Sequence, residues 1–344
     1  MRTPRFGEGV SLSPDEFRLL RDLFASRVGL QFGPESRYAL ERRLRERLMV
    51  LKLSSFAEYH HYLRFGMHAS DEWDEAIDLL TTNETYFFRE DRQLRAFQHE
   101  ILPMLETLAR PRRRLAIWSA GCSTGEEVYT LAILVHLSGL FATRAGNPAH
   151  LGPERPERPE RPERIEAVPR SAPPGPLRPP SSRARDGAGT AWAVRVYGSD
   201  ISRRCVAAAR RGVYAESSFR ATPDDVRKTF FYERADGWHV DDAIRQVCHF
   251  GQMNLLDEDR SRVLGRADAI FCRNVLIYFD ARARKAAIEV LYDRLNPGGV
   301  LLLGHSESLL NVSTAFELLH LRDDLVYRRP VSPRGSNQDP DDPS

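Results

Sequence analysis

Polar side chains that could hold a ligand stand at the end of an apolar run toward the C-terminus. The run starts at Ala267 and ends in Arg273 and Asn274, and Tyr278 follows four residues later. A guanidinium, an amide and a phenol left without partners in a protein core would cost about 1–3 kcal/mol each. We therefore interpret these side chains as part of a ligand site at a strand end, with a purely structural role as the alternative.

A loop of small residues and an acidic residue predict a site for an adenosine-containing cofactor. The loop around Gly121, in the stretch WSAGCSTGEE, would let a ligand approach the backbone closely. It lacks both the G-x-G-x-x-G dinucleotide fingerprint and the G-K-[ST] of a phosphate-binding loop. Asp200 ends the next predicted strand, where a carboxylate can accept hydrogen bonds from both hydroxyls of a ribose.

Local structure offers simpler explanations for the same residues. A tight strand-to-helix turn needs glycine for conformational reasons alone. Asp200 could be a helix N-cap, and Thr124 with Glu127 could cap the helix that follows the loop. These alternatives stay open at the level of the sequence.

Amide, hydroxyl and guanidinium groups also gather in the stretch TTNETYFFRE, residues 81–90. Asn83, Thr85 and Arg89 alternate there with three consecutive aromatic residues. A capped helix start would account for Asn83, but it does not account for Arg89 beside the aromatic run. We interpret the stretch as part of the same site, at the junction of two domains.

The elements that must position these groups form two parts. Residues 11–80 are predicted to be helical, because Ser13-Pro14-Asp15-Glu16 has the form of a capped helix start and leucines recur at helical spacing between Leu40 and Leu51. From residue 114 onward, short apolar runs alternate with helical patterns. Strands are predicted near residues 115–119, 193–198, 267–273 and 300–304, with a closing hairpin at 316–328. Such alternation is typical of a doubly wound, mostly parallel sheet, which binds ligands beyond the carboxyl ends of its strands.

Two segments lack the apolar residues that a folded core needs. Residues 142–191 are rich in Pro, Arg and Glu and contain the tripeptide Pro-Glu-Arg four times in succession, so we predict a disordered insertion. A motif for a proline-recognising partner is the alternative there. The polar tail, residues 331–344, is also predicted to be disordered.

The overall composition excludes several classes of protein. Lys and Arg number 50 against 48 Asp and Glu, which argues against a general nucleic-acid binder. Four cysteines without a C-x-x-C pair argue against a disulfide framework or a zinc site, so no metal is expected. The sequence contains no run of 18 apolar residues, so no membrane span is predicted, and no signal peptide is recognisable. We therefore expect a cytoplasmic protein, by default a monomer.

Taken together, the motifs resemble those of the CheR family, the chemotaxis methyltransferases that methylate glutamates of chemoreceptors with S-adenosylmethionine. The matching stretches, in order, are TTNETYFFRE, IWSAGCSTGEEVYTLAI, GSDIS, the NLL of GQMNLLD, FCRNVLIYFD and LLLGHSESL. The resemblance implies an α/β fold. A small all-α N-terminal domain (11–80) and a cofactor-covering linker (81–113) would precede a Rossmann-like class I methyltransferase domain (114–330). A small antiparallel β-subdomain is implied at 229–250.

The resemblance also implies a binding site for S-adenosylmethionine and its product S-adenosylhomocysteine. Carried over by position, the implied cofactor contacts are Asn83, Thr85, Arg89, Gly121, Glu126, Asp200, Asn254, Leu255, Arg273 and Asn274. Asp200 would take the ribose hydroxyls, and Asn254 with Leu255 would frame the adenine. Arg89 would bind either the methionine carboxylate or the substrate acid, and Tyr278 would orient the reacting groups. These two are the implied catalytic residues, with no general base and no essential histidine.

The partner implied by the resemblance is the cytoplasmic helical bundle of a chemoreceptor. We interpret Arg42, Arg45 and Arg47, on the Arg-rich helix of the N-terminal domain, as docking residues for its acidic surface. A solvated charged face is the alternative. The short turn at residues 235–237 argues against binding of a receptor tethering peptide. Two other functions stay open: methylation of a non-receptor acceptor, and a non-catalytic module that binds the cofactor and signals.

Overall fold

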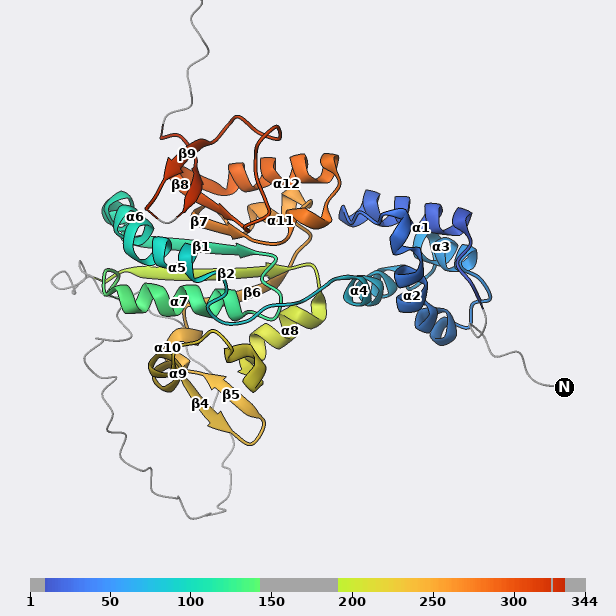
Figure 1. The fold of residues 1–344 in the computed structure, drawn as a ribbon, viewed down its shortest axis with the longest axis horizontal. Coiled ribbons are helices and arrows are strands. Elements are labelled where there is room, and N and C mark those ends of the chain that lie inside the picture. The colour runs from blue at the N-terminus through green and yellow to red at the C-terminus, as the bar shows by residue number, and fades with distance from the viewer. Residues whose placement is uncertain (1–9, 143–190, 323, 332–344) are drawn as a thin grey trace, which may run out of the picture.

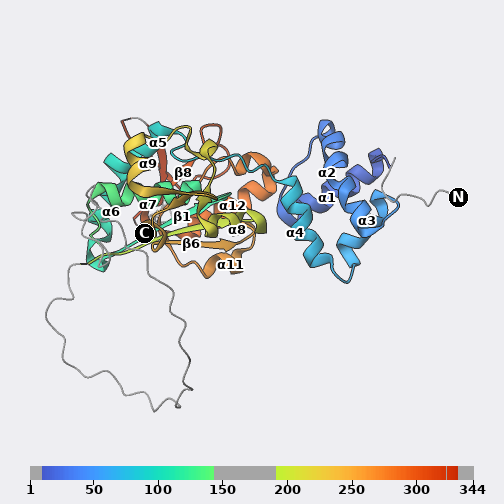
Figure 2. The same ribbon diagram turned by 90° about the horizontal axis from the view of Figure 1, so that it is seen from below.

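The computed structural model describes residues 10–142, 191–322 and 324–331. Figure 1 shows a bundle of helices joined by an extended segment to a larger α/β part, and Figure 2 shows the same division from below. The predictions of disorder for the insertion at 142–191 and for the tail at 331–344 lie outside the described residues, apart from the edges of both segments.

The N-terminal part is helical, as the sequence predicts. Its helices are α1 (Pro14–Val28), α2 (Arg37–Leu51), α3 (Phe56–Phe65) and α4 (Ala69–Leu80), with a 3-10 turn at Pro34–Ser36. The predicted start of α1 is confirmed: the Ser13 side chain accepts from the backbone N–H of Glu16, whose carboxylate accepts from the N–H of Ser13. Leu40, Leu44 and Leu48 are fully buried, so the apolar stripe of α2 forms the core of this domain.

The second part contains a seven-stranded sheet of order β6-β2-β1-β7-β8-β10-β9. The strands are β1 (Arg114–Ala120), β2 (Ala193–Asp200), β6 (Cys248–Gln252), β7 (Ala267–Cys272), β8 (Leu295–Leu303), β9 (Glu317–His320) and β10 (Leu325–Arg328). The first five in this order pair in parallel, and the closing hairpin is antiparallel. The order reverses between β1 and β7, which is where a doubly wound sheet binds ligands.

Helices cover the sheet on both faces (Figure 1). They are α5 (Asp91–Ala96), a π-helical segment (Phe97–Ile101), α6 (Leu102–Ala109), α7 (Glu126–Ser138), α8 (Arg203–Arg211), α11 (Glu258–Arg262) and α12 (Ala281–Arg294). Alternate residues of each strand face opposite layers, since successive side chains point to opposite sides of a sheet. Ile117 packs in the layer of α6 and α7, whereas the next residue, Trp118, packs in the layer of α12.

The small antiparallel sheet is present, but its limits differ from the predicted 229–250. It has the order β3-β5-β4, with β3 (Val213–Tyr214), β4 (Phe231–Arg234) and β5 (Gly237–Val240), and it is flanked by α9 (Asp224–Phe230) and α10 (Asp242–Arg245). The predicted range therefore omits β3 and includes part of β6, which pairs with β2 of the main sheet. A two-residue strand leaves no periodic signal in the sequence, and only tertiary pairing reveals it.

The start of β8 also differs from the prediction. The sequence predicts a strand near 300–304, yet β8 already begins at Leu295 and includes Asn296-Pro297-Gly298-Gly299. The pairing with β7 shifts register here, since Ala267 lies opposite Leu295 and Ala269 opposite Val300. Such a bulge accommodates a proline and two glycines without ending the strand.

Ion pairs and a hydrogen bond hold α4 of the helical domain against the start of α8. Arg203 Nη2 lies 3.1 Å from Glu75 Oε1, and the Ser202 hydroxyl donates to the carboxylate of Asp78. This junction places the end of α1 beside the carboxyl edge of the sheet. Among the described residues, no helix is long and apolar enough to cross a membrane.

Candidate cofactor and active site

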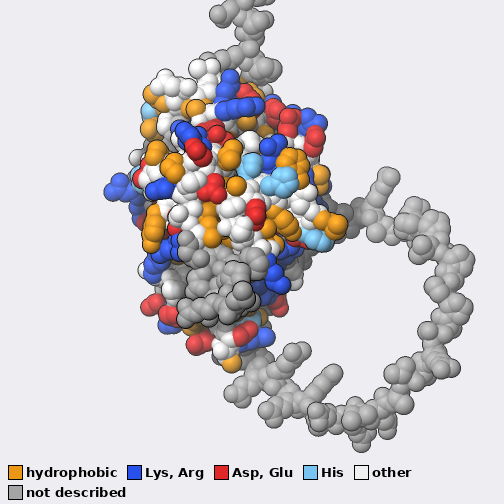
Figure 3. All heavy atoms as spheres, turned by 90° about the vertical axis from the view of Figure 1, so that its right-hand side faces the viewer, with side chains coloured by type: hydrophobic (Ala, Val, Ile, Leu, Met, Phe, Trp, Pro, Cys, Tyr) orange, Lys and Arg blue, Asp and Glu red, His pale blue; other side chains and the backbone are white. Residues whose placement is uncertain are grey.

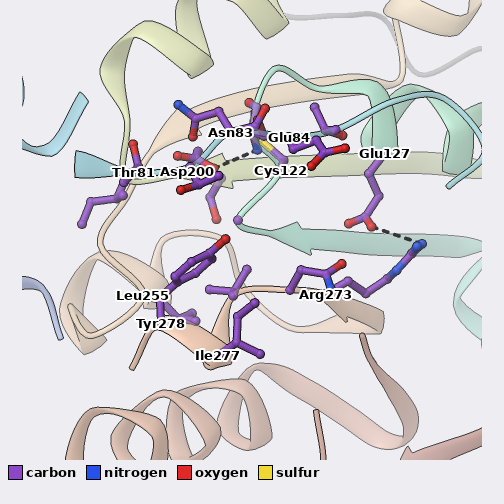
Figure 4. A pocket seen from close by; sticks show the side chains of 18 of the residues that line it. Thr81, Asn83, Glu84, Cys122, Glu127, Asp200, Leu255, Arg273, Ile277 and Tyr278 are labelled. Carbon is purple, nitrogen blue, oxygen red and sulfur yellow. Dashed lines mark hydrogen bonds and ion pairs between the residues drawn. The ribbon is translucent and has the colours of Figure 1, made fainter. Parts of the chain in front are cut away.

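A cavity lies at the carboxyl ends of the parallel strands, next to the point where the strand order reverses (Figure 4). Loops that follow β1, β2, β6 and β7 line it, together with the segment 81–89 and the end of α1. The predicted site residues that line it are Asn83, Thr85, Arg89, Gly121, Asp200, Asn254, Leu255, Arg273, Asn274 and Tyr278. The fold thus brings together residues that are up to about two hundred positions apart in the sequence.

Gly121 permits a close approach between the loops after β1 and β7. Its φ is 81°, and a Cβ added there would lie 2.3 Å from Cγ2 of Val275. The backbone N–H groups of Gly121 and Cys122 both donate to the carbonyl of Ser199, at 2.8 and 2.9 Å. Glycine is therefore required both by its conformation and by the space, and the loop is held against the end of β2.

Asp200 is buried at the end of β2 and is not the N-cap of α8. Its carboxylate accepts from the backbone N–H of Ser123 at 2.8 Å and of Ser202 at 2.9 Å. Ser202 is the N-cap, with its hydroxyl accepting from the N–H of Cys205. Burial raises the pKa of Asp200, while the two backbone donors oppose that rise. Each carboxylate oxygen keeps further acceptor capacity for a ligand hydroxyl.

Glu127, rather than Glu126, faces the cavity. Glu126 accepts from the hydroxyls of Thr124 and Ser218, at 2.6 and 3.1 Å, and is absent from the cavity wall. Burial raises its pKa. The cavity wall therefore contains Glu127 in place of Glu126, and the predicted contact of Glu126 with the cofactor has no counterpart in this cavity. Successive helical residues point about 100° apart, so only one of two adjacent glutamates can face the cavity.

The alternative in which Thr124 and Glu127 cap the helix after the loop is not what the structure shows. The N-cap of α7 is Gly125, which makes no side-chain cap, and Glu127 instead accepts from the Ser119 hydroxyl at 2.7 Å. Its other oxygen lies 3.3 Å from Nη1 of Arg273. The adjacent pair of acids in the first turn of a helix was the available signal, but the sequence did not say which of them faces inward.

Arg273 joins the end of β7 to the segment that covers the cavity. Its guanidinium donates to the carbonyl of Arg89 at 2.7 Å and lies 3.2 Å from the carboxylate of Glu90. With its pairing to Glu127, this cation ties three separate segments together (Figure 4). Arg273 thus shapes the wall of the cavity as well as lining it.

The helical domain closes another side of the cavity. Val28, Leu30, Gln31 and Phe32 line it, and the N–H of Gln31 donates to the carbonyl of Tyr278 at 2.8 Å. The side-chain amide of Asn254 donates to the carbonyl of Arg27 at 3.0 Å. Residues on both domains are therefore needed to complete the walls.

The cavity has the chemical groups that S-adenosylmethionine requires. Asp200 offers carboxylate oxygens for ribose hydroxyls, and Met253, Leu255 and Val275 offer apolar surface for an adenine. Arg89, whose guanidinium donates to the carbonyl of Glu84 at 2.8 Å, offers further N–H donors for a carboxylate. The residues present fit this cofactor.

Comparison with known families decides the assignment. The family model "CheR methyltransferase, SAM binding domain" matches residues 83–144 and 183–324, and "CheR methyltransferase, all-alpha domain" matches residues 15–81. The chain belongs to the CheR methyltransferase family. The family resemblance noted from the motifs is thereby confirmed, as is a methyltransferase fold with S-adenosylmethionine as the cofactor.

Several chemotaxis protein methyltransferases are similar in sequence to this CheR-family chain over nearly its whole length. Chemotaxis protein methyltransferase 2 of Vibrio cholerae is 32% identical over 324 residues, 93% of this chain and 95% of its own. Chemotaxis protein methyltransferase 2 of Pseudomonas aeruginosa is 31% identical, over 90% of this chain and 93% of its own. The chemotaxis protein methyltransferase of Escherichia coli is 30% identical, over 93% of this chain and 92% of its own.

The three arginines predicted to dock a partner of this CheR-family chain lie in different environments. Arg47 donates to both carboxylate oxygens of Glu72, at 2.9 and 2.6 Å, and its side chain is only 16% exposed. Arg47 therefore ties α2 to α4 within the helical domain, which favours a structural role over the predicted docking role. Arg45 pairs with Glu41 one turn away, and Arg42 is exposed.

On the face of the molecule formed by the outer end of the helical domain, basic side chains do not gather in one patch. Figure 3 shows Lys and Arg interspersed there with acidic and hydrophobic side chains. Docking through charge would therefore depend on individual residues such as Arg42 rather than on a uniformly basic surface.

Proposed function

We propose that this chain transfers a methyl group from S-adenosylmethionine to glutamate side chains in the cytoplasmic helical bundle of a chemoreceptor. The product would be a glutamate methyl ester, and the role would be adaptation in chemosensory signalling. The observation that carries the proposal is the extent of the likeness to chemotaxis protein methyltransferases. It spans both domains, 93% of the chain for the Vibrio cholerae relative, so the helical domain is part of it.

Methyl transfer to a glutamate carboxylate needs little help from acidic or basic side chains of the enzyme. Bound S-adenosylmethionine supplies a methyl group that is activated by the positive charge on sulfur. A glutamate acceptor with an ordinary pKa of about 4.3 is already ionised at neutral pH, so it needs no general base. Among the described residues, no histidine lines the cavity, which supports a mechanism without one.

Alignment is then the main task of the protein. Tyr278 lines the cavity while remaining 38% exposed, so its hydroxyl can reach both the interior and an incoming side chain. Arg89 lines the same cavity and can attract the acceptor carboxylate or hold the cofactor carboxylate. Holding the reacting groups in line can contribute up to about 7–11 kcal/mol to catalysis.

The proposal is tested by transfer of a labelled methyl group to a purified receptor cytoplasmic fragment. We expect base-labile label on the fragment, as for a methyl ester, and none when its labelled glutamates are replaced by glutamine. Tyr278→Phe should lower the rate about 10-fold or more without changing the affinity for S-adenosylhomocysteine. Tight cofactor binding without any transfer would instead favour a non-catalytic binding module. Label on another acceptor alone would favour a different substrate.

A further inference from the structure

Glu307 lies in the turn after β8 and uses both carboxylate oxygens on backbone N–H groups. One oxygen accepts from Asn274 and from Gly304, both at 2.8 Å. The other accepts from Val275 at 2.9 Å and from Ile277 at 3.2 Å. This residue belongs to the stretch LLLGHSESL, and none of the cofactor or catalytic roles described above involves it.

Three of the four N–H groups that Glu307 holds, those of Asn274, Val275 and Ile277, belong to the loop after β7, which forms one wall of the cavity. Asn274, Val275, Ile277 and Tyr278 all line the cavity. The loop starts in a strained conformation, because Asn274 has a φ of 59°, in the left-handed region. Without an acceptor, each part-buried N–H would cost about 1–3 kcal/mol, so the loop depends on this carboxylate for its shape.

Gly304 adds an independent constraint on the same loop. A Cβ at this position would lie 2.8 Å from the backbone nitrogen of Asn274 and 2.9 Å from Oε2 of Glu307. No side chain fits there without displacing the loop or the carboxylate. The end of β8 and the loop after β7 are therefore built to touch through Glu307.

We propose that Glu307 is a positioning residue for methyl transfer, acting through the loop at 274–278. It does not touch the reacting groups itself. Its carboxylate holds Asn274 on the cofactor side and, through Ile277, the adjacent Tyr278 on the acceptor side, in one fixed geometry. Because a displacement of about 1 Å can cost about 100-fold in rate, the carboxylate should matter more for turnover than for cofactor affinity.

The test is Glu307→Gln, measured for methyl transfer and for binding of S-adenosylhomocysteine. An amide has only one oxygen, so in either orientation its nitrogen would face two N–H donors. We expect the turnover rate to fall about 10- to 100-fold. The dissociation constant should change less than about 3-fold, because Asn83, Asp200 and Asn254 lie on other loops.

Matched variants separate this role from general destabilisation. Glu289→Gln removes an exposed carboxylate on α12 and should leave the rate unchanged. Gly304→Ala should reproduce the effect of Glu307→Gln, whereas Gly251→Ala, where an added Cβ meets nothing within 4 Å, should not. A fall in rate matched by an equal loss of cofactor affinity, or a Gly304→Ala variant with normal turnover, would overturn the proposal.

The rate measurement rests on the proposed function, so a second readout is independent of it. Amide hydrogen exchange in the wild-type protein should show protection of Asn274, Val275 and Ile277, although none of their N–H groups belongs to a sheet ladder. Glu307→Gln should speed the exchange of those amides that face its side-chain nitrogen, either Asn274 or the pair Val275 and Ile277, at least about 10-fold. Fast exchange of these amides in the wild type would overturn the positioning role. A wild type that transfers no methyl to the receptor fragment would count only against the proposed function.

Discussion

Nη1 of Arg273 lies 3.3 Å from Oε2 of Glu127, and this pair joins the end of β7 to the first turn of α7 at the cavity (Figure 4). The Arg273 side chain is only 3% exposed and that of Glu127 18%, so water screens the pair weakly. Burial raises the pKa of Glu127, whereas the charge of Arg273 and the Ser119 hydroxyl lower it. The pair therefore joins two segments of the cavity wall.

Replacing Glu127 should therefore weaken cofactor binding, whereas replacing Glu126 should not. Glu127→Gln leaves Arg273 without one of its anionic partners and removes a charge that lines the cavity. Hydrogen bonds to charged groups contribute about 1.5–3 kcal/mol, so we expect a loss of about 10- to 100-fold in affinity for S-adenosylmethionine by calorimetry. Glu126→Gln is the matched control, since its side chain faces Thr124 and Ser218. Equal effects of the two variants would contradict this assignment.

Asp200 should make the apo protein less stable as the pH rises. Folding raises the pKa of Asp200 above its ordinary value near 3.9. Below that ordinary value the residue does not destabilise the folded state, because it is protonated in both states. As the pH rises through the raised pKa, the charged form becomes populated and the folded state loses stability. Asp200→Asn removes this term. The free energy of unfolding of the variant, relative to the wild type, should therefore rise between about pH 4 and pH 7, by about 1.4 kcal/mol per unit of pKa shift. Urea unfolding at both pH values measures it, and a relative stability that falls over this range would refute the prediction.

Arg47 should matter for folding of the helical domain, and Arg42 for docking. Arg47→Ala leaves the buried carboxylate of Glu72 with only the Tyr59 hydroxyl as a partner, which should cost about 3–5 kcal/mol in the free energy of unfolding. Arg42→Glu changes an exposed side chain, so its effect on stability should stay within about 0.5 kcal/mol. Receptor methylation by Arg42→Glu should nevertheless fall several-fold, with unchanged affinity for S-adenosylhomocysteine. Unaltered methylation would exclude Arg42 from the docking surface.

Gly29 should be required for the helical domain to pack against the methyltransferase domain. Gly29 ends α1 with a φ of 76°, and an added Cβ would lie 2.9 Å from Cβ of Ala283 and from Cδ1 of Leu256. Gly139 ends α7 with a φ of 64° and has nothing within 4 Å. Both substitutions to alanine carry the strain of a left-handed backbone, but only Gly29→Ala also overpacks, by about 1–3 kcal/mol.

Thermal unfolding and cofactor binding separate the two glycine variants. Gly29→Ala should lower the unfolding midpoint more than Gly139→Ala does. It should also weaken binding of S-adenosylhomocysteine, because the neighbouring Val28 and Leu30 line the cavity. If the two variants behave alike, the contact between the domains does not depend on this glycine.

Much of the fold follows from local signals that the sequence carries within a few residues. The capping box at Ser13, the buried leucines of α2 and the alternation of apolar runs with helical patterns all correspond to elements of the structure. The types of residue in the cavity were also predictable, because polar groups directly after apolar strands indicate a site at the edge of a parallel sheet. Asp200 and Arg273 are examples.

Other features depend on contacts between segments far apart in the chain, and the sequence did not determine them. Glu126 and Glu127 are chemically identical, and the packing of α7 against the sheet alone sets which one faces the cavity. The sequence does not distinguish Arg47 from the other arginines of α2, and only the packing of α4 places Glu72 opposite it. Likewise, nothing in the local sequence distinguishes Glu307 from other acidic residues in turns. Its role follows only from the tertiary contact between its oxygens and the loop after β7. Local periodicity sets which elements form, but the rotation and pairing of those elements come from tertiary packing, which no short stretch of sequence records.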